Sequence, residues 1–122
     1  MDYLLDSVIL IGHFNNIPQA SAFLQQHKNH SAISVITRAE VLTGFAEEHQ
    51  NLAKSFLDGF LTLTIDKNIA DLAARLRQQF RWKLPDALQA AVAQQHQLIL
   101  VTRNTKDFPP NQHDFALTPY QI

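Results

Sequence analysis

Short apolar runs alternate with amphipathic stretches along this chain of 122 residues. The run at 98–101 is continuous and rich in Leu, Ile and Val, which is typical of a parallel strand covered on both faces. The predicted strands are 3–5, 33–36, 61–65 and 98–101, with a further short edge strand at 115–118. Between them, apolar side chains recur at spacings of three and four, which predicts amphipathic helices. The predicted helices are 19–27, 37–46, 50–60, 68–81 and 85–93.

The order of these elements predicts an α/β fold. Strands and helices follow one another as β, α, β, α, α, β, α, α, β, with the last short strand after them. This order indicates a mainly parallel central sheet of four or five strands that is covered by helices. A chain of 122 residues has the length of one domain, so residues 1–122 are expected to share one fold.

Composition and charge narrow the classes of function. No apolar run approaches the roughly 20 residues that span a bilayer, and the N-terminus lacks the pattern of a signal peptide, so no membrane partner is expected. The absence of Cys excludes disulfides and fits a cytoplasmic location. A net charge of -1 gives no general attraction to nucleic acid, so such a partner would have to bind a local basic surface or metal ions.

One local basic surface is present in the second half of the chain. Arg75 and Arg77 lie on the polar face of the predicted helix 68–81, and Arg81 and Lys83 follow closely. These four positive charges are either an ordinary solvated face or a contact surface for RNA phosphates or an acidic partner.

Acidic side chains occur at positions that a parallel sheet would bring together. Asp6 follows the first strand, Glu40 lies in the first turns after the second, and Asp107 follows the last long strand. Asp86 lies in the first turn of a helix, where a negative charge is favoured. Structural alternatives exist for two of them, because Asp6 can cap a helix and Thr37 with Glu40 has the form of a capping box.

If these carboxylates share one pocket, their mutual repulsion raises their pKa values unless cations are bound. Oxygen ligands of this kind suit Mg²⁺ or Mn²⁺. Divalent ions in such a site activate water for attack on a phosphodiester and stabilise the leaving oxygen. The acidic positions therefore predict metal-dependent hydrolysis.

Four segments of the chain resemble successive motifs of the PIN-domain family, specifically the VapC-type toxins of bacterial toxin–antitoxin pairs. The segments are 4–7 (LLDS), 36–44 (ITRAEVLTG), 84–93 (LPDALQAAVA) and 101–108 (VTRNTKDF). They occur in order and span nearly the whole chain. The resemblance implies a single PIN domain with a three-layer α/β/α fold and Mg²⁺-dependent endoribonuclease activity. It also implies a homodimer and a VapB-type antitoxin that blocks the site.

The resemblance further implies roles for individual residues. Asp6, Glu40 and Asp86 match the acidic positions of the family, as metal ligands and catalytic residues. The fourth position is open between Asn104 and Asp107. We expect Asp107 to be the acid and Asn104 to assist by a hydrogen bond or a substrate contact.

Two hydroxyl side chains are expected to support this site. Ser7 stands where the family commonly has Thr, and its hydroxyl is expected to orient Asp6. Thr102 is expected to donate a hydrogen bond to a neighbouring carboxylate.

Other classes of protein fit the sequence less well. A haloacid-dehalogenase-type phosphatase requires a second Asp two residues after Asp6, where this chain has Val8, and a response-regulator receiver requires an adjacent acidic pair that is missing. His27 and His30 lack the further ligands of a zinc site. The remaining alternative is a non-catalytic PIN-like module that binds RNA or protein.

Overall fold

The structure is a computed structural model that describes residues 1–109, 113 and 115–120. Its α-helices are α1 (Ser7–Phe14), α2 (Pro18–His27), α3 (Val35–Thr43), α4 (Gln50–Leu57), α5 (Lys67–Phe80) and α6 (Leu84–Gln95), and short 3-10 helices cover Lys28–His30 and Glu47–His49. Its strands are β1 (Tyr3–Leu5), β2 (Ser31–Ser34), β3 (Leu61–Leu63), β4 (Ile99–Val101) and β5 (Ala116–Leu117).

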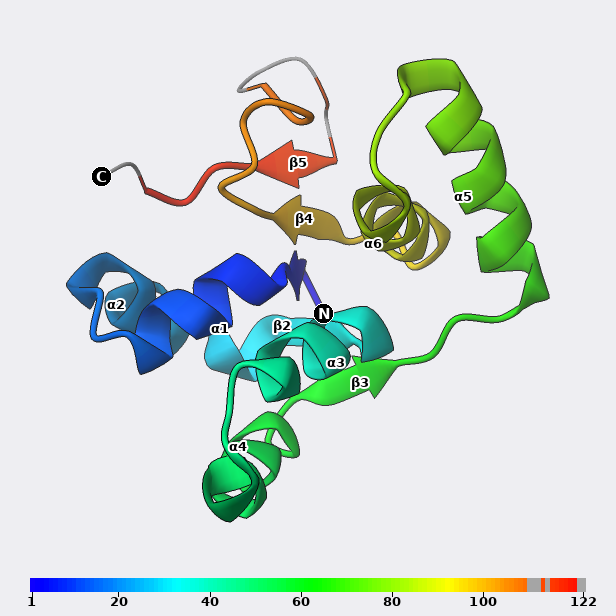
Figure 1. The fold of residues 1–122 in the computed structure, drawn as a ribbon. Helices are drawn as coiled ribbons and strands as arrows, with labels where there is room; N and C mark the ends of the chain where they lie inside the picture. The colour runs from blue at the N-terminus through cyan, green and yellow to red at the C-terminus, as the bar shows by residue number, and fades with distance from the viewer. Residues whose placement is uncertain (110–112, 114, 121–122) are drawn as a thin grey trace.

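The strands form one parallel sheet in the order β3-β2-β1-β4-β5 (Figure 1). The register places Leu4 of β1 beside Ala32 of β2 on one side and Leu100 of β4 on the other. The first strand of the chain therefore lies in the middle of the sheet. This arrangement confirms the predicted α/β fold, and β5 gives the sheet its fifth strand.

The two faces of the sheet carry separate hydrophobic cores, because neighbouring residues of a strand point to opposite faces. Leu5 and Ile33 belong to a core that they share with residues of α1, α2, α3 and α4. Leu4 and Ala32 belong to the core formed with α5 and α6. Helices therefore cover both faces, which is the predicted three-layer α/β/α arrangement (Figure 1).

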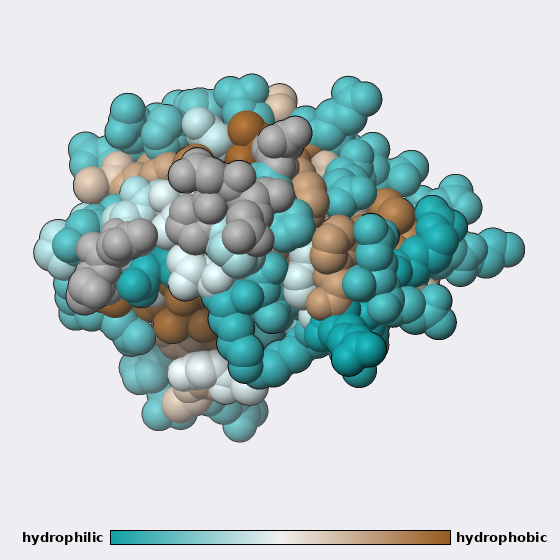
Figure 2. Space-filling model, turned by 90° about the horizontal axis from the view of Figure 1, so that it is seen from above, coloured by the Kyte–Doolittle hydropathy of each residue, from teal (hydrophilic) through white to brown (hydrophobic). Residues whose placement is uncertain are grey.

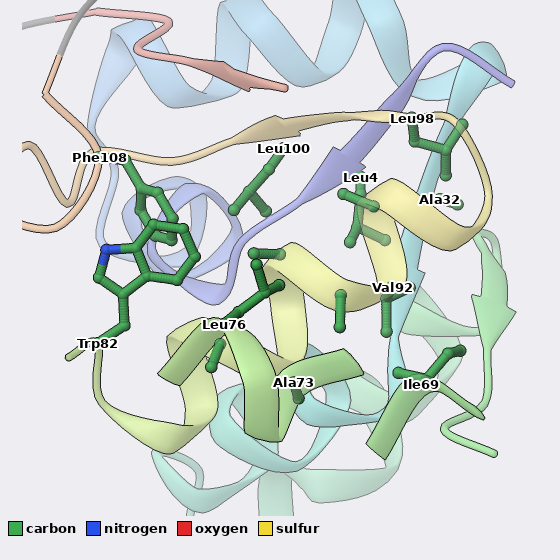
Figure 3. Close-up of a cluster of buried hydrophobic side chains, with 14 residues drawn as sticks. Leu4, Ala32, Ile69, Ala73, Leu76, Trp82, Val92, Leu98, Leu100 and Phe108 are labelled. Atoms are coloured by element: carbon green, nitrogen blue, oxygen red, sulfur yellow. The ribbon is translucent and has the colours of Figure 1, made fainter. Parts of the chain in front are cut away.

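α6 contributes mainly small side chains to its core, and aromatic rings close this core at one end. The fully buried alanines of this helix are Ala87, Ala90, Ala91 and Ala93. Trp82 and Phe108 pack together at the end of this core, with ring centroids 4.7 Å apart (Figure 3). Because Trp82 lies shortly before Asp86 and Phe108 directly follows Asp107, this contact brings together the two segments that carry these carboxylates.

The second strand and the helix after it begin earlier than predicted. β2 ends at Ser34, and Ser34 is the N-cap of α3, since its hydroxyl accepts hydrogen bonds from the backbone N–H groups of Ile36 and Thr37. The predicted capping box of Thr37 with Glu40 is therefore wrong. Thr37 is instead buried, and its hydroxyl donates to the backbone carbonyl of Leu5, which ties α3 to β1.

Two helices rather than one lie between the first two strands. The apolar run after Asp6 forms α1, and Asp6 is its N-cap residue. α2 begins at Pro18, because a proline suits the first helical turn. The remaining predicted helices and strands are confirmed, although α4 ends at Leu57 and β3 at Leu63, each a few residues earlier than predicted.

The described part of the chain contains no helix that is long and apolar enough to cross a lipid bilayer. Figure 2 shows the molecule from the top of Figure 1. The surface on this side is mostly hydrophilic, and its hydrophobic side chains form separate patches. Hydrophobic side chains are therefore dispersed on this face rather than gathered in one continuous area.

Candidate active site

The carboxyl ends of β1 and β4 bring Asp6 and Thr102 together. These strands are adjacent and parallel, so the residues that follow them leave the sheet at the same edge. Asp6 is 9% exposed, and its Oδ2 accepts a hydrogen bond from the Thr102 hydroxyl at 2.6 Å. Its Oδ1 accepts from the backbone N–H of Ser7 at 2.8 Å. Both bonds restrict the orientation of the Asp6 carboxylate.

Asn104 lies between two further carboxylates. Its Nδ2 donates to Oδ2 of Asp86 at 3.1 Å and to Oδ2 of Asp107 at 3.2 Å. Its Oδ1 accepts from the backbone N–H of Asp107, and its own backbone N–H donates to the Thr102 hydroxyl. One chain of hydrogen bonds therefore joins Asp6 to Asp86 and Asp107. Both candidates for the fourth acidic position, Asn104 and Asp107, lie in this chain.

Glu40 approaches these residues from α3. It is the most exposed of the four carboxylates, yet partial burial is the largest cause of its raised pKa. A hydrogen bond from the Ser7 side chain lowers this pKa, and the charge of Asp6 raises it. Asp6 accepts its hydrogen bond from the backbone N–H of Ser7. The prediction that the Ser7 hydroxyl orients Asp6 stays a prediction.

Asp86 has the most strongly shifted pKa of the four carboxylates. Burial, a hydrogen bond with Asp107 and the charges of Asp6 and Asp107 raise its pKa from 3.8 to about 7, although the hydrogen bond from Asn104 opposes this rise. In the absence of a cation, the Asp86 carboxyl therefore keeps its proton up to about pH 7. The site is one in which a bound cation would relieve repulsion.

The donor atoms of the site suit a hard divalent cation. Carboxylate and amide oxygens are the ligands that Mg²⁺ and Mn²⁺ prefer, and here they belong to Asp6, Glu40, Asp86, Asn104 and Asp107. Within the described residues, no three Asp, Glu, His or Cys side chains are grouped closely enough to hold a metal ion. The Asn104 amide bridges Asp86 and Asp107, so an ion shared by three carboxylates requires at least one side chain to rotate.

The four predicted basic residues are exposed on α5 and on the segment between α5 and α6; they are Arg75, Arg77, Arg81 and Lys83. Arg77 and Arg81 line an open groove of about 450 Å³ together with Leu84, which lies two residues before Asp86. Arg77 also donates from Nη1 to the backbone carbonyl of Trp82 at 2.7 Å, which stabilises this segment. The groove therefore reaches the first turn of α6, in which Asp86 lies.

A buried polar network lies behind the carboxylates, and the sequence analysis did not identify it. Gln89 is 1% exposed; its Oε1 accepts from the Ser34 hydroxyl at 2.7 Å, and its Nε2 donates to the Thr37 hydroxyl at 2.6 Å. Gln89 comes three residues after Asp86 and so lies near the same side of α6. The network holds α6, and with it Asp86, against β2 and α3. The signal in the sequence is a polar residue within an alanine-rich buried helix.

Comparison with known proteins identifies a family for this fold. The PIN domain family model matches residues 3–109. The matched range contains all four candidate carboxylates as well as Asn104. A search of curated proteins found no match.

Solved structures resemble the chain over most of its length. A chain of a toxin–antitoxin complex from Klebsiella pneumoniae is 39% identical with a TM-score of 0.91, and the alignment covers 99% of this chain and 100% of that chain. A chain of VapBC2 from Rickettsia felis, solved with a DNA fragment from its promoter, is 25% identical with a TM-score of 0.73 and coverages of 88% and 91%. A chain of FitAcB from Neisseria gonorrhoeae is 24% identical with a TM-score of 0.80 and coverages of 98% and 99%, a likeness of fold alone. The chain thus belongs to the PIN-domain family, as its motifs predict.

Proposed function

We propose that this protein is an Mg²⁺-dependent endoribonuclease toxin of a toxin–antitoxin module. The observation that carries the proposal is the chain of hydrogen bonds that joins Asp6, Asp86 and Asp107 at the carboxyl ends of the central strands. A half-buried carboxyl with a pKa of about 7 opposes folding, and such groups are concentrated at functional sites. The relative from Klebsiella pneumoniae, which is 39% identical, belongs to a toxin–antitoxin complex.

In the proposed reaction, Asp6, Glu40, Asp86 and Asp107 would hold the ion after a side-chain rotation brings them together, and they would orient the water that attacks the RNA phosphorus. Bound Mg²⁺, or Mn²⁺ in its place, supplies the Lewis-acid chemistry of phosphodiester hydrolysis. Asp6 is the most firmly oriented ligand, because Thr102 and the Ser7 backbone bind both of its oxygens. Asn104 lowers the repulsion between Asp86 and Asp107 by donating to both.

The basic surface is proposed to bind RNA phosphates outside the carboxylate site. The overall charge of -1 attracts no polyanion, so local cations have to supply the attraction. The groove lined by Arg77 and Arg81 reaches the first turn of α6, which carries Asp86. Arg75 is exposed on α5, and Lys83 is exposed just before α6. An antitoxin with an acidic segment would compete for these residues.

The proposed protein partner is a VapB-type antitoxin that inhibits cleavage. The Klebsiella relative belongs to a toxin–antitoxin complex, and this chain aligns with it over 99% of its length. The Rickettsia relative belongs to VapBC2, and this chain aligns with it over 88% of its length. We further propose that residues 1–122 form a single PIN domain, that the protein is a homodimer, and that it acts in the cytoplasm. Copurification of a tagged chain from its native cell, followed by mass spectrometry and light scattering, tests the partner and the dimer.

Cleavage of structured RNA by the purified protein tests the nuclease. We expect cleavage with Mg²⁺ that stops when EDTA is added. Asp6→Asn is expected to abolish cleavage while the protein remains folded, because Asn is also a good N-cap residue for α1. The matched control is Asp66→Asn, since Asp66 caps α5 by accepting from the N–H of Ile69 at 2.9 Å and is not part of the carboxylate chain.

The nuclease proposal makes opposite predictions for the two variants. Asp66→Asn is expected to cleave RNA at the wild-type rate, and cleavage by Asp6→Asn at that same rate would contradict the proposed role of Asp6. A protein that binds RNA or a partner, but cuts no RNA with Mg²⁺ or Mn²⁺, would be the alternative, a non-catalytic PIN-like binding module.

A further inference from the structure

Arg103 lies between the two residues that bind the carboxylates. Thr102 before it donates to Asp6, and Asn104 after it donates to the two other aspartates of the hydrogen-bonded chain. The backbone N–H of Asn104 also donates to the Thr102 hydroxyl at 3.1 Å. These bonds hold the backbone on both sides of Arg103 at the edge of the site.

The Arg103 side chain packs on an aromatic ring rather than on a carboxylate. Its Cζ lies 4.9 Å from the ring centroid of Tyr120, which is a cation–π contact. The side chain is half-buried, its Nε is buried without a hydrogen-bond partner, and it forms no ion pair within the described part of the chain. Arg38, by contrast, pairs with Asp58 at 2.8 Å. Stacking uses only the face of a guanidinium, so Arg103 keeps its charge and its terminal Nη donors for a ligand.

Tyr120 is itself held against α1. Its ring packs on the core that contains Leu5 and Ile9, and its hydroxyl is buried. A methyl group added at Gly12 would lie only 3.0 Å from this hydroxyl oxygen, so the ring approaches α1 closely at a position without a side chain. Burial raises the pKa of Tyr120 and the charge of Arg103 lowers it, in agreement with their contact. The position of the Tyr120 ring is therefore restricted, and with it the position of the stacked guanidinium.

We propose that Arg103 binds an RNA phosphate next to the cleaved bond, and that Tyr120 holds the guanidinium in position for it. This inference rests on the proposed ribonuclease function and adds a substrate-binding residue to it. Carboxylates repel a polyanion, and a cation at the edge of the site would offset part of this repulsion for the nearest phosphate. Arg suits this task because its planar donors match the geometry of a phosphate. The rival explanation is that the contact of Arg103 with Tyr120 serves the fold alone.

RNA binding at several salt concentrations separates these explanations. The binding assay uses the Asp6→Asn background so that the RNA stays intact, and a fluorescein-labelled single-stranded RNA of mixed sequence reports binding by anisotropy. Arg103→Gln is expected to weaken binding about tenfold at low salt, as for loss of one charge-assisted hydrogen-bonded contact. It should also reduce the slope of log Kd against log [KCl] by about 0.7, the value for one phosphate on a single strand. Arg103→Lys should retain the slope.

The matched control is Arg38→Gln, which removes the same charge from a residue that is already paired with Asp58. We expect its salt slope to equal that of the background protein. In the catalytically active protein, Arg103→Gln and Tyr120→Leu are expected to raise KM and to change kcat little, because contact with a neighbouring phosphate is made in the ground state as well as the transition state. An unchanged salt slope in Arg103→Gln would overturn the inference.

A measurement on the unsubstituted protein covers the case in which a variant fails to fold. Phenylglyoxal modifies arginines, and bound RNA is expected to slow modification of Arg103 but not of Arg38, as read by peptide mass spectrometry. Equal rates with and without RNA, or no RNA binding at all, would overturn the inference. Binding is measured without cleavage, so the two proposals can fail separately. If the protein binds RNA through Arg103 but never cuts it, the nuclease proposal is refuted and the role of Arg103 in RNA binding stands.

Discussion

Asp86→Asn is expected to stabilise the metal-free protein, and to do so more at pH 8 than at pH 5. In the unfolded chain the Asp86 carboxyl has an ordinary pKa of 3.8, whereas its surroundings raise the pKa to about 7 in the folded protein. Between these two values the folded state binds more protons than the unfolded state. The free energy of unfolding therefore falls as the pH rises from about 4 to about 7. Asn removes the ionisation and keeps nearly the same shape.

The size of the effect follows from the shifted pKa. A rise from 3.8 to about 7 corresponds to at most about 4 kcal/mol at pH 8, since each pKa unit is about 1.4 kcal/mol. Asp86 is only half-buried, so solvent screening reduces this to about 2 kcal/mol. At pH 5 less than half of that difference has developed. The expected gain at pH 8 corresponds to about 8 °C in Tm for a chain of this size.

Urea and thermal unfolding in EDTA at pH 5 and pH 8 measure this prediction. Asp66→Asn is the control, because it makes the same chemical change at the exposed cap of α5. Its effect is expected to be small. Equal stabilisation of Asp86→Asn at both pH values, or a loss of stability at pH 8, would refute the idea that carboxylate repulsion acts on Asp86.

Three further outcomes are expected. Mg²⁺ should raise the Tm of the wild-type protein at pH 8 but not that of Asp6→Asn; equal shifts in calorimetry would exclude Asp6 as a ligand. Gly12→Ala is expected to lower the free energy of unfolding by about 1–2 kcal/mol, because its methyl group would lie 3.0 Å from the Tyr120 hydroxyl and 3.2 Å from Cβ of Ala20. An unchanged urea midpoint would show that these neighbours give way easily. Gln89→Leu is expected to cost about 2–3 kcal/mol in the same assay, since the buried hydroxyls of Ser34 and Thr37 each lose one hydrogen bond. Full stability would argue against that network.

The layers of the fold could be predicted because they depend on the periodicity of apolar residues. The continuous run 98–101 indicated a strand covered on both faces, and β4 lies inside the sheet with helices on either side. The approach of Asp6 to the residues after β4 followed from the same reasoning, since parallel strands deliver their carboxyl ends to one edge. The pattern thus contained both the architecture and the neighbourhood of Asp6 and Asp107.

The hydrogen bonds of Thr102 and Asn104 to carboxylates were predicted from the family resemblance. Other hydrogen-bond partners could not be predicted, because the apolar pattern reports burial but not which polar atoms meet. Thr37 followed by Glu40 has the form of a capping box, and only the earlier end of β2 at Ser34 decides against it. The Ser7 side chain has two possible acidic partners, Asp6 next to it in the sequence and Glu40 on α3. Such choices depend on the angle between α1 and α3, which spacing along the sequence does not contain.

The hydrogen bond between Asp6 and Thr102 joins residues that are 96 positions apart. Closing this loop costs conformational entropy before the hydrogen bond can offset it, so a fold with such non-local contacts is expected to form slowly. A chain that has formed only its local helices would therefore have no assembled carboxylate pocket. Recovery of catalysis during refolding should accordingly be among the slowest signals, later than the recovery of helical circular dichroism.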